Sequence, residues 1–121
     1  MARRVLMVDD SKTTRDMVVF TLRRAGYEVI EADDGRKALE RLGNDVVDCV
    51  ITDLNMPGMD GLELIRALRA STAHRETPIL MLTTEDDAAR QQAGQQAGAN
   101  KWLGKPFHPK TLVETVAQMI V

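Results

Sequence analysis

The sequence contains a single cysteine and very few aromatic residues. Of its 121 residues, only Cys49 carries a thiol, and aromatic side chains make up 3%. One cysteine cannot form an internal disulfide, and a lone thiol inside an apolar run is typical of a protein from a reducing compartment. We therefore expect a cytoplasmic protein in which Cys49 is a small buried hydrophobe and not a reactive group.

A strong excess of charge and a long hydrophobic run are also missing. Sixteen basic and 18 acidic residues leave a formal net charge of -2, which provides no general attraction to nucleic acid or to an anionic membrane. The apolar stretch behind the N-terminal arginines, residues 5–8, is too short for a signal peptide or a membrane span. We therefore expect neither nucleic acid nor a membrane among the partners.

What is present is the composition of one globular domain. Hydrophobic residues account for 44% and charged residues for 28% of the chain, which excludes the composition of a disordered protein. A length of 121 residues is enough for one hydrophobic core but too short for two. We expect a single domain over residues 1–121.

Short apolar runs alternate five times with segments of helical periodicity. The predicted strands are residues 5–8, 27–31, 46–52, 79–82 and 99–103. The predicted helices run from the cap Ser11 to Gly26, over 36–42, around 62–68, from a first turn at Glu85, Asp86 and Asp87 to Gly98, and from Pro109 onward. This alternation predicts an α/β fold: a flavodoxin-like, five-stranded parallel sheet in the order 2-1-3-4-5, with five helices on its two faces.

Reactive side chains follow the ends of four of these runs. Asp9 and Asp10 follow the first strand, and Asp53 follows the third. Thr83 ends the fourth run, and Lys105 comes shortly after the fifth. Ligands of such sheets bind outside the carboxyl ends of the strands at the switch point, which lies between strands 1 and 3 in this order. We therefore expect these five side chains to form one cluster.

Three carboxylates in one cluster repel one another, so the cluster needs positive charge. Lys105 supplies one charge, and a divalent cation would supply two more. An all-oxygen ligand set without imidazole or thiolate favours Mg²⁺ over zinc. We expect Asp53, the central carboxylate, to be the nucleophile that accepts a phosphoryl group, with Asp9 and Asp10 holding the metal. Thr83 and Lys105 would bind phosphoryl oxygens.

Each of these segments also has a simpler interpretation when it is taken alone. Asp9 and Asp10 could cap the first helix, and Asp53 could belong to the turn chemistry of Pro57 and Gly58. A threonine after a strand can cap a helix, and an isolated lysine is usually solvated. Their joint occurrence at four strand ends argues against all of these interpretations at once.

Five motifs, spread over the whole chain, resemble one known family. They are VDDS at 8–11, TDLNMPGMDG at 52–61, LTTE at 82–85, AGA at 97–99 and KPF at 105–107. With these motifs the sequence resembles the receiver domain of two-component response regulators, most closely the stand-alone chemotaxis regulators of the CheY type. The resemblance implies a phosphorelay protein that a histidine kinase of the chemotaxis type phosphorylates on Asp53.

The resemblance also implies the roles of individual residues at the metal and the acceptor. Asp10, Asp53 and the backbone carbonyl of Asn55 would bind Mg²⁺, and Asp9 would act through metal-bound water. Asn55 and Glu85, each two residues beyond a key position, match the family pattern that tunes self-dephosphorylation.

A second group of implied roles concerns the switch. Thr83 and Lys105 would contact the phosphoryl group, and the Lys105-Pro106 peptide bond would be cis. Trp102 occupies the position of the aromatic residue that moves inward when the hydroxyl residue is drawn to the phosphoryl group.

The expected function is therefore signalling, and the protein is not expected to be an enzyme beyond its own phosphorylation and dephosphorylation. Because the chain ends with its fifth helix, we expect no output domain, and we expect the protein to be a monomer. Its output would be a partner that binds the face of the fourth helix, fifth strand and fifth helix. By resemblance, this partner is a flagellar motor switch protein. The alternative is a phosphate sink that competes for the kinase.

Two further hypotheses come from other classes of protein. A Mg²⁺-dependent phosphatase could use the same aspartyl intermediate, but the sequence lacks an acid/base aspartate two residues after Asp53 and a substrate-selecting cap. A receiver-like interaction module that is never phosphorylated is the other hypothesis. The intact acidic set with Lys105 argues against it.

Overall fold

The computed structural model describes residues 2–84 and 87–120. Five parallel strands form one sheet in the order β2-β1-β3-β4-β5, as predicted. The strands are β1 (Arg4–Val8), β2 (Glu28–Ala32), β3 (Cys49–Asp53), β4 (Ile79–Thr84) and β5 (Lys101–Lys105). The helices are α1 (Lys12–Arg24), α2 (Gly35–Leu42), α3 (Gly61–Ala70), α4 (Ala88–Ala97) and α5 (Pro109–Met119), with a short 3₁₀ helix η1 (Thr72–His74) before β4.

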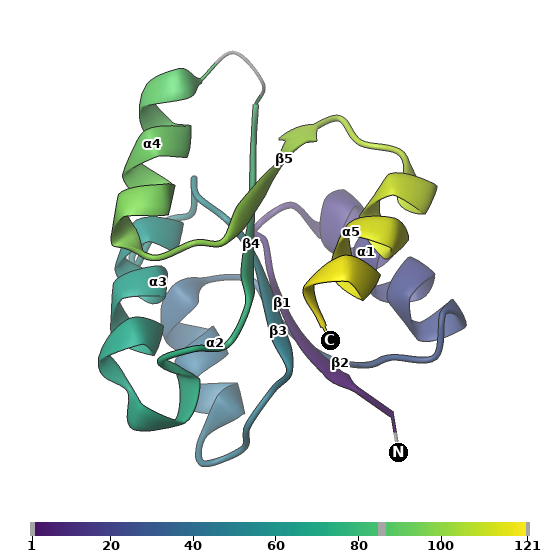
Figure 1. Ribbon diagram of the computed structural model, residues 1–121, viewed down its shortest axis with the longest axis horizontal. Helices are drawn as coiled ribbons and strands as arrows, with labels where there is room; N and C mark the ends of the chain where they lie inside the picture. The colour runs from purple at the N-terminus through teal and green to yellow at the C-terminus, as the bar shows by residue number, and fades with distance from the viewer. Residues whose placement is uncertain (1, 85–86, 121) are drawn as a thin grey trace.

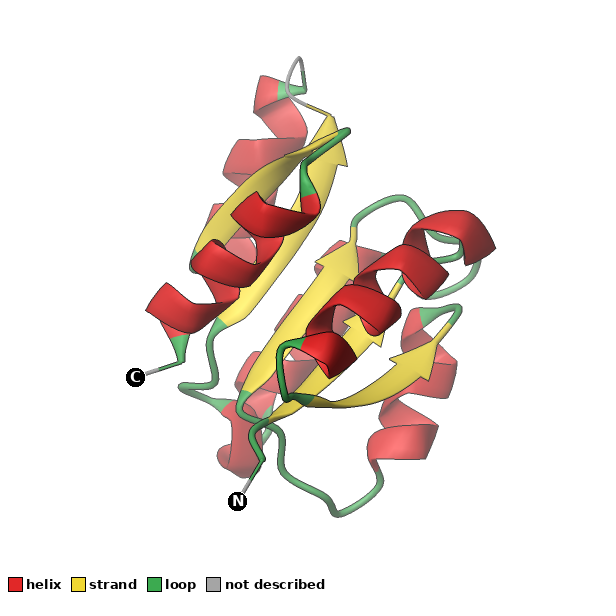
Figure 2. Ribbon diagram, turned by 90° about the vertical axis from the view of Figure 1, so that its right-hand side faces the viewer, coloured by secondary structure: helices red, strands yellow, loops and turns green. Residues whose placement is uncertain are grey.

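Helices cover both faces of the sheet. Figure 1 shows α2, α3 and α4 on one face and α1 and α5 on the other, and Figure 2 shows α1 and α5 in front of the strands. Alternate residues of β1 serve the two cores, with Val5 and Met7 packing under α1 and α5 while Leu6 and Val8 pack under the other helices. All four are fully buried, which explains why this strand is a continuous apolar run in the sequence.

The third strand begins later than predicted. We expected a strand over 46–52, but β3 starts at Cys49 and includes Asp53. Val46 is 55% exposed, so the prediction that this valine belongs to the buried run was wrong. Val47 is buried, but its backbone N–H donates to Nε2 of His74 at 3.3 Å instead of entering the sheet.

The fifth strand also begins later, at Lys101 instead of residue 99, and extends to Lys105. The end of α4 explains this shift, because the N–H groups of Gly98 and Ala99 both donate to the carbonyl of Gly94. These residues complete the helix terminus and are not available to pair with β4. The fourth strand extends past its predicted end to Thr84.

Helix ends agree with the sequence signals except at α4. The Ser11 hydroxyl accepts from the Thr14 N–H at the start of α1, and Pro109 begins α5. Glu85 and Asp86, predicted in the first turn of the fourth helix, lie outside the described residues. Asp87 is the N-cap and not a first-turn residue, because its side chain accepts from the Arg90 N–H that the helix leaves unpaired.

Candidate functional site

The carboxyl ends of β1, β3 and β5 bring Asp9, Asp53 and Lys105 together. Strands β1 and β3 are neighbours with Val8 opposite Thr52, so the two aspartates that follow come to the same edge of the sheet. Lys105 extends over the end of β4, and its Nζ lies 3.1 Å from Asp9 Oδ2 and 3.3 Å from Asp53 Oδ2. One ammonium thus bridges two carboxylates.

Asp10 completes an acidic cluster. One carboxylate oxygen each from Asp9, Asp10 and Asp53 lies within 4.8 Å of the others. Asp9 is fully buried and Asp53 is 6% exposed, whereas Asp10 is exposed. Three carboxylates face a single ammonium here, so the cluster has the excess negative charge and the open side that suit a small divalent cation.

The electrostatics of the cluster follow from its burial. Burial raises the pKa of Asp53, the neighbouring Asp9 carboxylate raises it further, and Lys105 opposes both effects. Burial by itself would lower the pKa of Lys105, but Asp53 and Asp9 outweigh it, so the pKa of the lysine is raised. Lys105 therefore remains an ammonium at neutral pH.

Two further predicted residues lie on the segments next to Asp53, since Asn55 follows β3 and Thr83 is one residue past Leu82, which pairs with Asp53. The Asn55 backbone N–H donates to Asp53 Oδ1 at 3.4 Å, which orients the carboxylate from the loop between β3 and α3. Thr83 is 2% exposed, and its hydroxyl has no hydrogen-bond partner within residues 2–84 and 87–120. A buried hydroxyl without a partner is unusual, and it suits a site that receives an additional oxygen ligand.

Trp102 lies on β5 opposite Met81 of β4. Its side chain is half-buried and packs against the core under α2, α3 and α4. The Lys105-Pro106 bond is cis, as predicted. Glu85, predicted to tune dephosphorylation, lies outside the described residues.

Two contacts around Leu54 were not predicted from the sequence. Arg90 of α4 donates its Nη2 to the Leu54 carbonyl at 3.0 Å, and the Gly61 N–H donates to the same oxygen at 3.1 Å. A side chain at Gly61 would collide with the backbone of Asp53 and Leu54, so only glycine allows this close approach. No local signal in the sequence pointed to Arg90.

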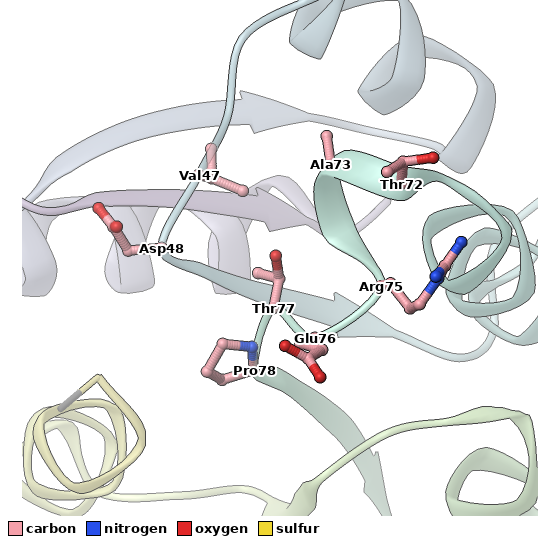
Figure 3. Close-up of a pocket in the computed structure, with 8 residues that line it drawn as sticks. All are labelled: Val47, Asp48, Thr72, Ala73, Arg75, Glu76, Thr77 and Pro78. Carbon is pink, nitrogen blue, oxygen red and sulfur yellow. The ribbon is translucent and has the colours of Figure 1, made fainter.

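A separate hollow of about 490 Å³ lies at the opposite end of the sheet (Figure 3). It is lined by Val47, Asp48, Thr72, Ala73, Arg75, Glu76, Thr77 and Pro78. Asp48 and Pro78 precede β3 and β4, whereas Asp53 and Thr83 lie at the far ends of these strands. The hollow is therefore not part of the acidic cluster.

The fold and the site together define a doubly wound α/β protein with an acidic, lysine-bridged cluster at the switch point of its sheet. The model of the response regulator receiver domain matches residues 5–117. Chemotaxis protein CheY1 of Helicobacter pylori J99 is 44% identical over 113 residues, which cover 92% of this chain and 91% of that protein. The chain therefore belongs to the response regulator receiver domain family and is a two-component response regulator.

Solved structures agree with this assignment. The chemotaxis response regulator CheY4 of Vibrio cholerae has a TM-score of 0.93 and 46% identity, covering 98% of this chain and 99% of that one. A receiver domain of a Pseudomonas aeruginosa PAO1 sensor histidine kinase has a TM-score of 0.91 and 28% identity, covering 99% and 98%, and holds a magnesium ion in its active site cleft. Over the described ranges 2–84 and 87–120, no helix has the length and apolar composition that crossing a membrane requires.

Proposed function

We propose that this response regulator accepts a phosphoryl group from a histidine kinase on Asp53, with Mg²⁺ as cofactor. The observation that carries the proposal is the position of Lys105 Nζ, 3.1 Å from Asp9 and 3.3 Å from Asp53. A structural ion pair needs one carboxylate, whereas two carboxylates and a third one nearby leave the cluster short of positive charge. Such a cluster suits a site that binds a cation and then an anionic group.

The residues present fit Mg²⁺. Asp9, Asp10 and Asp53 offer three carboxylate oxygens within 4.8 Å of one another, and the backbone carbonyl of Asn55 would add a fourth. These are the hard oxygen ligands that Mg²⁺ prefers. When bound, Mg²⁺ supplies positive charge that lets an anionic phosphoryl group approach the carboxylates.

The side chains of the chain itself would divide the remaining work. An Asp53 oxygen forms the new bond to phosphorus while the bond from phosphorus to the imidazole nitrogen of the kinase breaks. Lys105, already an ammonium, would move its contacts from the carboxylates to phosphoryl oxygens. The unpartnered hydroxyl of Thr83 would donate to another phosphoryl oxygen.

The output would be a two-state change that begins at Thr83 and extends to Trp102. Phosphorylation adds about 1.5 to 2 negative charges and three acceptor oxygens at Asp53, and the movement of Thr83 would bias the face of α4, β5 and α5. We propose that this face binds a partner in chemotaxis, such as a flagellar motor switch protein. A phosphate sink that competes for the kinase is the alternative.

The remaining parts of the proposal concern the chain as a whole. We propose that residues 1–121 form one monomeric receiver domain that acts in the cytoplasm, in keeping with the free, buried thiol of Cys49. Its only chemistry would be its own phosphorylation and dephosphorylation. Asn55 and Glu85 would set the lifetime of the phosphorylated state.

Intact-mass analysis with acetyl phosphate tests the acceptor. Wild type with Mg²⁺ is expected to gain one base-labile phosphoryl adduct, and wild type without Mg²⁺ or the Asp53→Asn variant is expected to gain none. Asp45→Asn, at an exposed aspartate before the start of β3 and thus at the other end of this strand from Asp53, is the matched control and is expected to keep the adduct. An adduct that persists in Asp53→Asn would place the acceptor elsewhere, and steady turnover of common phosphoesters would favour a phosphatase.

A further inference from the structure

Helix α4 is attached to the domain mainly by polar contacts at its ends. Gly94 is its one buried residue among those that the structure describes, and it lies so close to β4 that any side chain there would collide with the sulfur of Met81. At the C-terminal end, Arg69 donates its Nη2 and Nε to the Gly98 carbonyl at 2.8 and 3.0 Å. With only this one buried residue among those described, α4 depends on individual hydrogen bonds for its position more than the other α-helices do.

At the N-terminal end, α4 is bonded to the ends of two strands. Gln91 donates its Nε2 to the Thr84 carbonyl at the end of β4, at 3.1 Å. Arg90 donates its Nη2 to the Leu54 carbonyl, directly after β3, at 3.0 Å. Thr84 and Leu54 follow Thr83 and Asp53 immediately, so α4 is bonded next to both the proposed switch hydroxyl and the proposed acceptor.

The bond of Arg90 controls more than one atom, because the peptide unit is planar. The Leu54 carbonyl and the Asn55 N–H belong to the same peptide plane and point in opposite directions. On one side of this plane the carbonyl accepts from Arg90 as well as from the Gly61 N–H, and on the other side the N–H donates to Asp53 Oδ1 at 3.4 Å. Fixing the carbonyl therefore fixes the donor that orients the Asp53 carboxylate.

The rest of the Arg90 guanidinium supports a functional interpretation. The side chain is half-buried, and its Nε is a buried donor without a partner in residues 2–84 and 87–120. A buried unpaired donor opposes folding, so a residue selected only for stability would not be expected to be an arginine in this position. The contact with Leu54 is its one hydrogen bond from the side chain within these ranges.

We propose that Arg90 is a positioning residue for the phosphoacceptor. It holds the Leu54–Asn55 peptide plane so that the Asn55 N–H stays directed at Asp53, and the same bond connects the acceptor loop to α4. The proposal rests on the proposed function of Asp53. Without Arg90, the Asp53 carboxylate would spend less time in the orientation that reacts, and phosphoryl transfer would be slower although Asp53, Lys105 and the metal ligands are intact.

Three variants separate this role from a structural one. Arg90→Met keeps much of the apolar stem but removes every donor, Arg90→Lys keeps the charge but not the planar guanidinium, and Gln95→Met changes an exposed residue of the same helix as a control. The maximal rate of phosphorylation by acetyl phosphate is measured at saturating Mg²⁺. We expect Arg90→Met to lower it about five- to twentyfold and Arg90→Lys about two- to fivefold, with Gln95→Met unchanged.

The Asn55 amide resonance in a proton–nitrogen NMR spectrum gives a readout that needs no phosphorylation. We expect it to shift in Arg90→Met, less so in Arg90→Lys, and not in Gln95→Met, because only the first two alter the peptide plane. A wild-type rate together with an unshifted Asn55 amide in Arg90→Met would overturn the proposal. If Arg90→Met does not fold, Arg90→Lys decides: a rate and an amide shift equal to wild type would overturn the proposal, and changes in both would support it.

The experiments distinguish a failure of the proposal about Arg90 from a failure of the proposed function of Asp53. If wild type gains no adduct, or Asp53→Asn keeps it, the acceptor assignment fails and positioning of the acceptor by Arg90 fails with it. If wild type is phosphorylated on Asp53 and the Arg90 variants behave like the control, only the inference about Arg90 is wrong.

Discussion

Lys105 Nζ lies 3.3 Å from Asp53 Oδ2, although β4 separates their two strands in the sheet. The lysine also contacts the buried Asp9 at 3.1 Å. One cation thus partly compensates an acidic cluster that could hold a second cation.

Removing the lysine is expected to separate metal binding from phosphoryl transfer. In Lys105→Met the carboxylates of Asp9 and Asp53 lose their positive neighbour, so Mg²⁺ is expected to bind at least about threefold more tightly. Phosphorylation by acetyl phosphate is expected to fall at least about tenfold, because a contact with the phosphoryl oxygens is lost. Titration calorimetry and intact-mass kinetics measure the two effects, with the exposed Lys101→Met as control. Weaker Mg²⁺ binding in Lys105→Met would contradict the electrostatic argument.

The Thr83 hydroxyl is expected to contribute to switching and not to stability. Because it has no partner in the described part of the chain, the near-isosteric Thr83→Val should leave the free energy of unfolding unchanged or raise it by about 1 kcal/mol. Its phosphorylated form should not acquire the active conformation, whereas Thr83→Ser should do so. Denaturant unfolding and fluorescence of the phosphorylated proteins test both points. A loss of more than about 2 kcal/mol in Thr83→Val would mean that the hydroxyl has a partner after all.

Trp102 offers a direct signal of that conformation. The indole is half-buried against the core and lies opposite Met81, two residues before Thr83. We expect its fluorescence to change when Mg²⁺ and phosphodonor are added together, and not to change on phosphodonor in Asp53→Asn. An unaltered signal in phosphorylated wild type would show that the acceptor is not coupled to β5.

His74 is expected to make the protein less stable in mild acid. Burial lowers the pKa of His74, and its Nε2 accepts the Val47 N–H at 3.3 Å, which requires the neutral ring. Below a pH of about 6.5 the unfolded chain binds a proton that the folded chain does not, so stability falls as the pH falls. The fall has a limiting slope of about 1.4 kcal/mol per pH unit and ends at the folded pKa.

Urea unfolding between pH 7.5 and 5 measures this slope. His74→Gln keeps an acceptor that does not titrate and should reduce the slope, while Gln95→Met at an exposed position should not. An identical slope in wild type and His74→Gln would assign the pH dependence to other groups.

Cys49 is expected to be inert in the folded protein. Burial, followed by the nearby charge of Asp48, raises the pKa of the thiol to about 12, so almost no thiolate exists at pH 8. Iodoacetamide should modify native protein only as fast as it unfolds, while Gln95→Cys, on the exposed side of α4, should react at once. Mass analysis distinguishes one alkylated site from two. Rapid modification of wild type would contradict the buried position of Cys49.

The strand order and the members of the acidic cluster could be predicted before any coordinates were known. A strand buried on both faces is a continuous apolar run, and β1 shows this directly in residues 5–8. Parallel strands end at the same edge, so Asp9, Asp53 and Lys105 were predicted to meet there. Conversely, the predicted start of β3 was wrong because Val46 and Val47 are as apolar as Val50 and Ile51. The Val47 N–H bonds to His74, which is distant in sequence, and Val46 is exposed to solvent, so the neighbouring residues do not show where the strand begins.

The local sequence determined the order of the helices and strands and the edge of the sheet that carries the acidic residues. This is because the spacing of apolar residues along a short segment already indicates which residues are buried and where a strand or helix ends. Tertiary structure alone decided that Lys105 bridges two carboxylates and that Arg90 bonds the peptide that follows Asp53 and Leu54. It also decided that the Thr83 hydroxyl has no partner in the described residues. Hydrogen bonds between residues distant in sequence depend on how closely the packed elements approach, and periodicity carries no information about that distance.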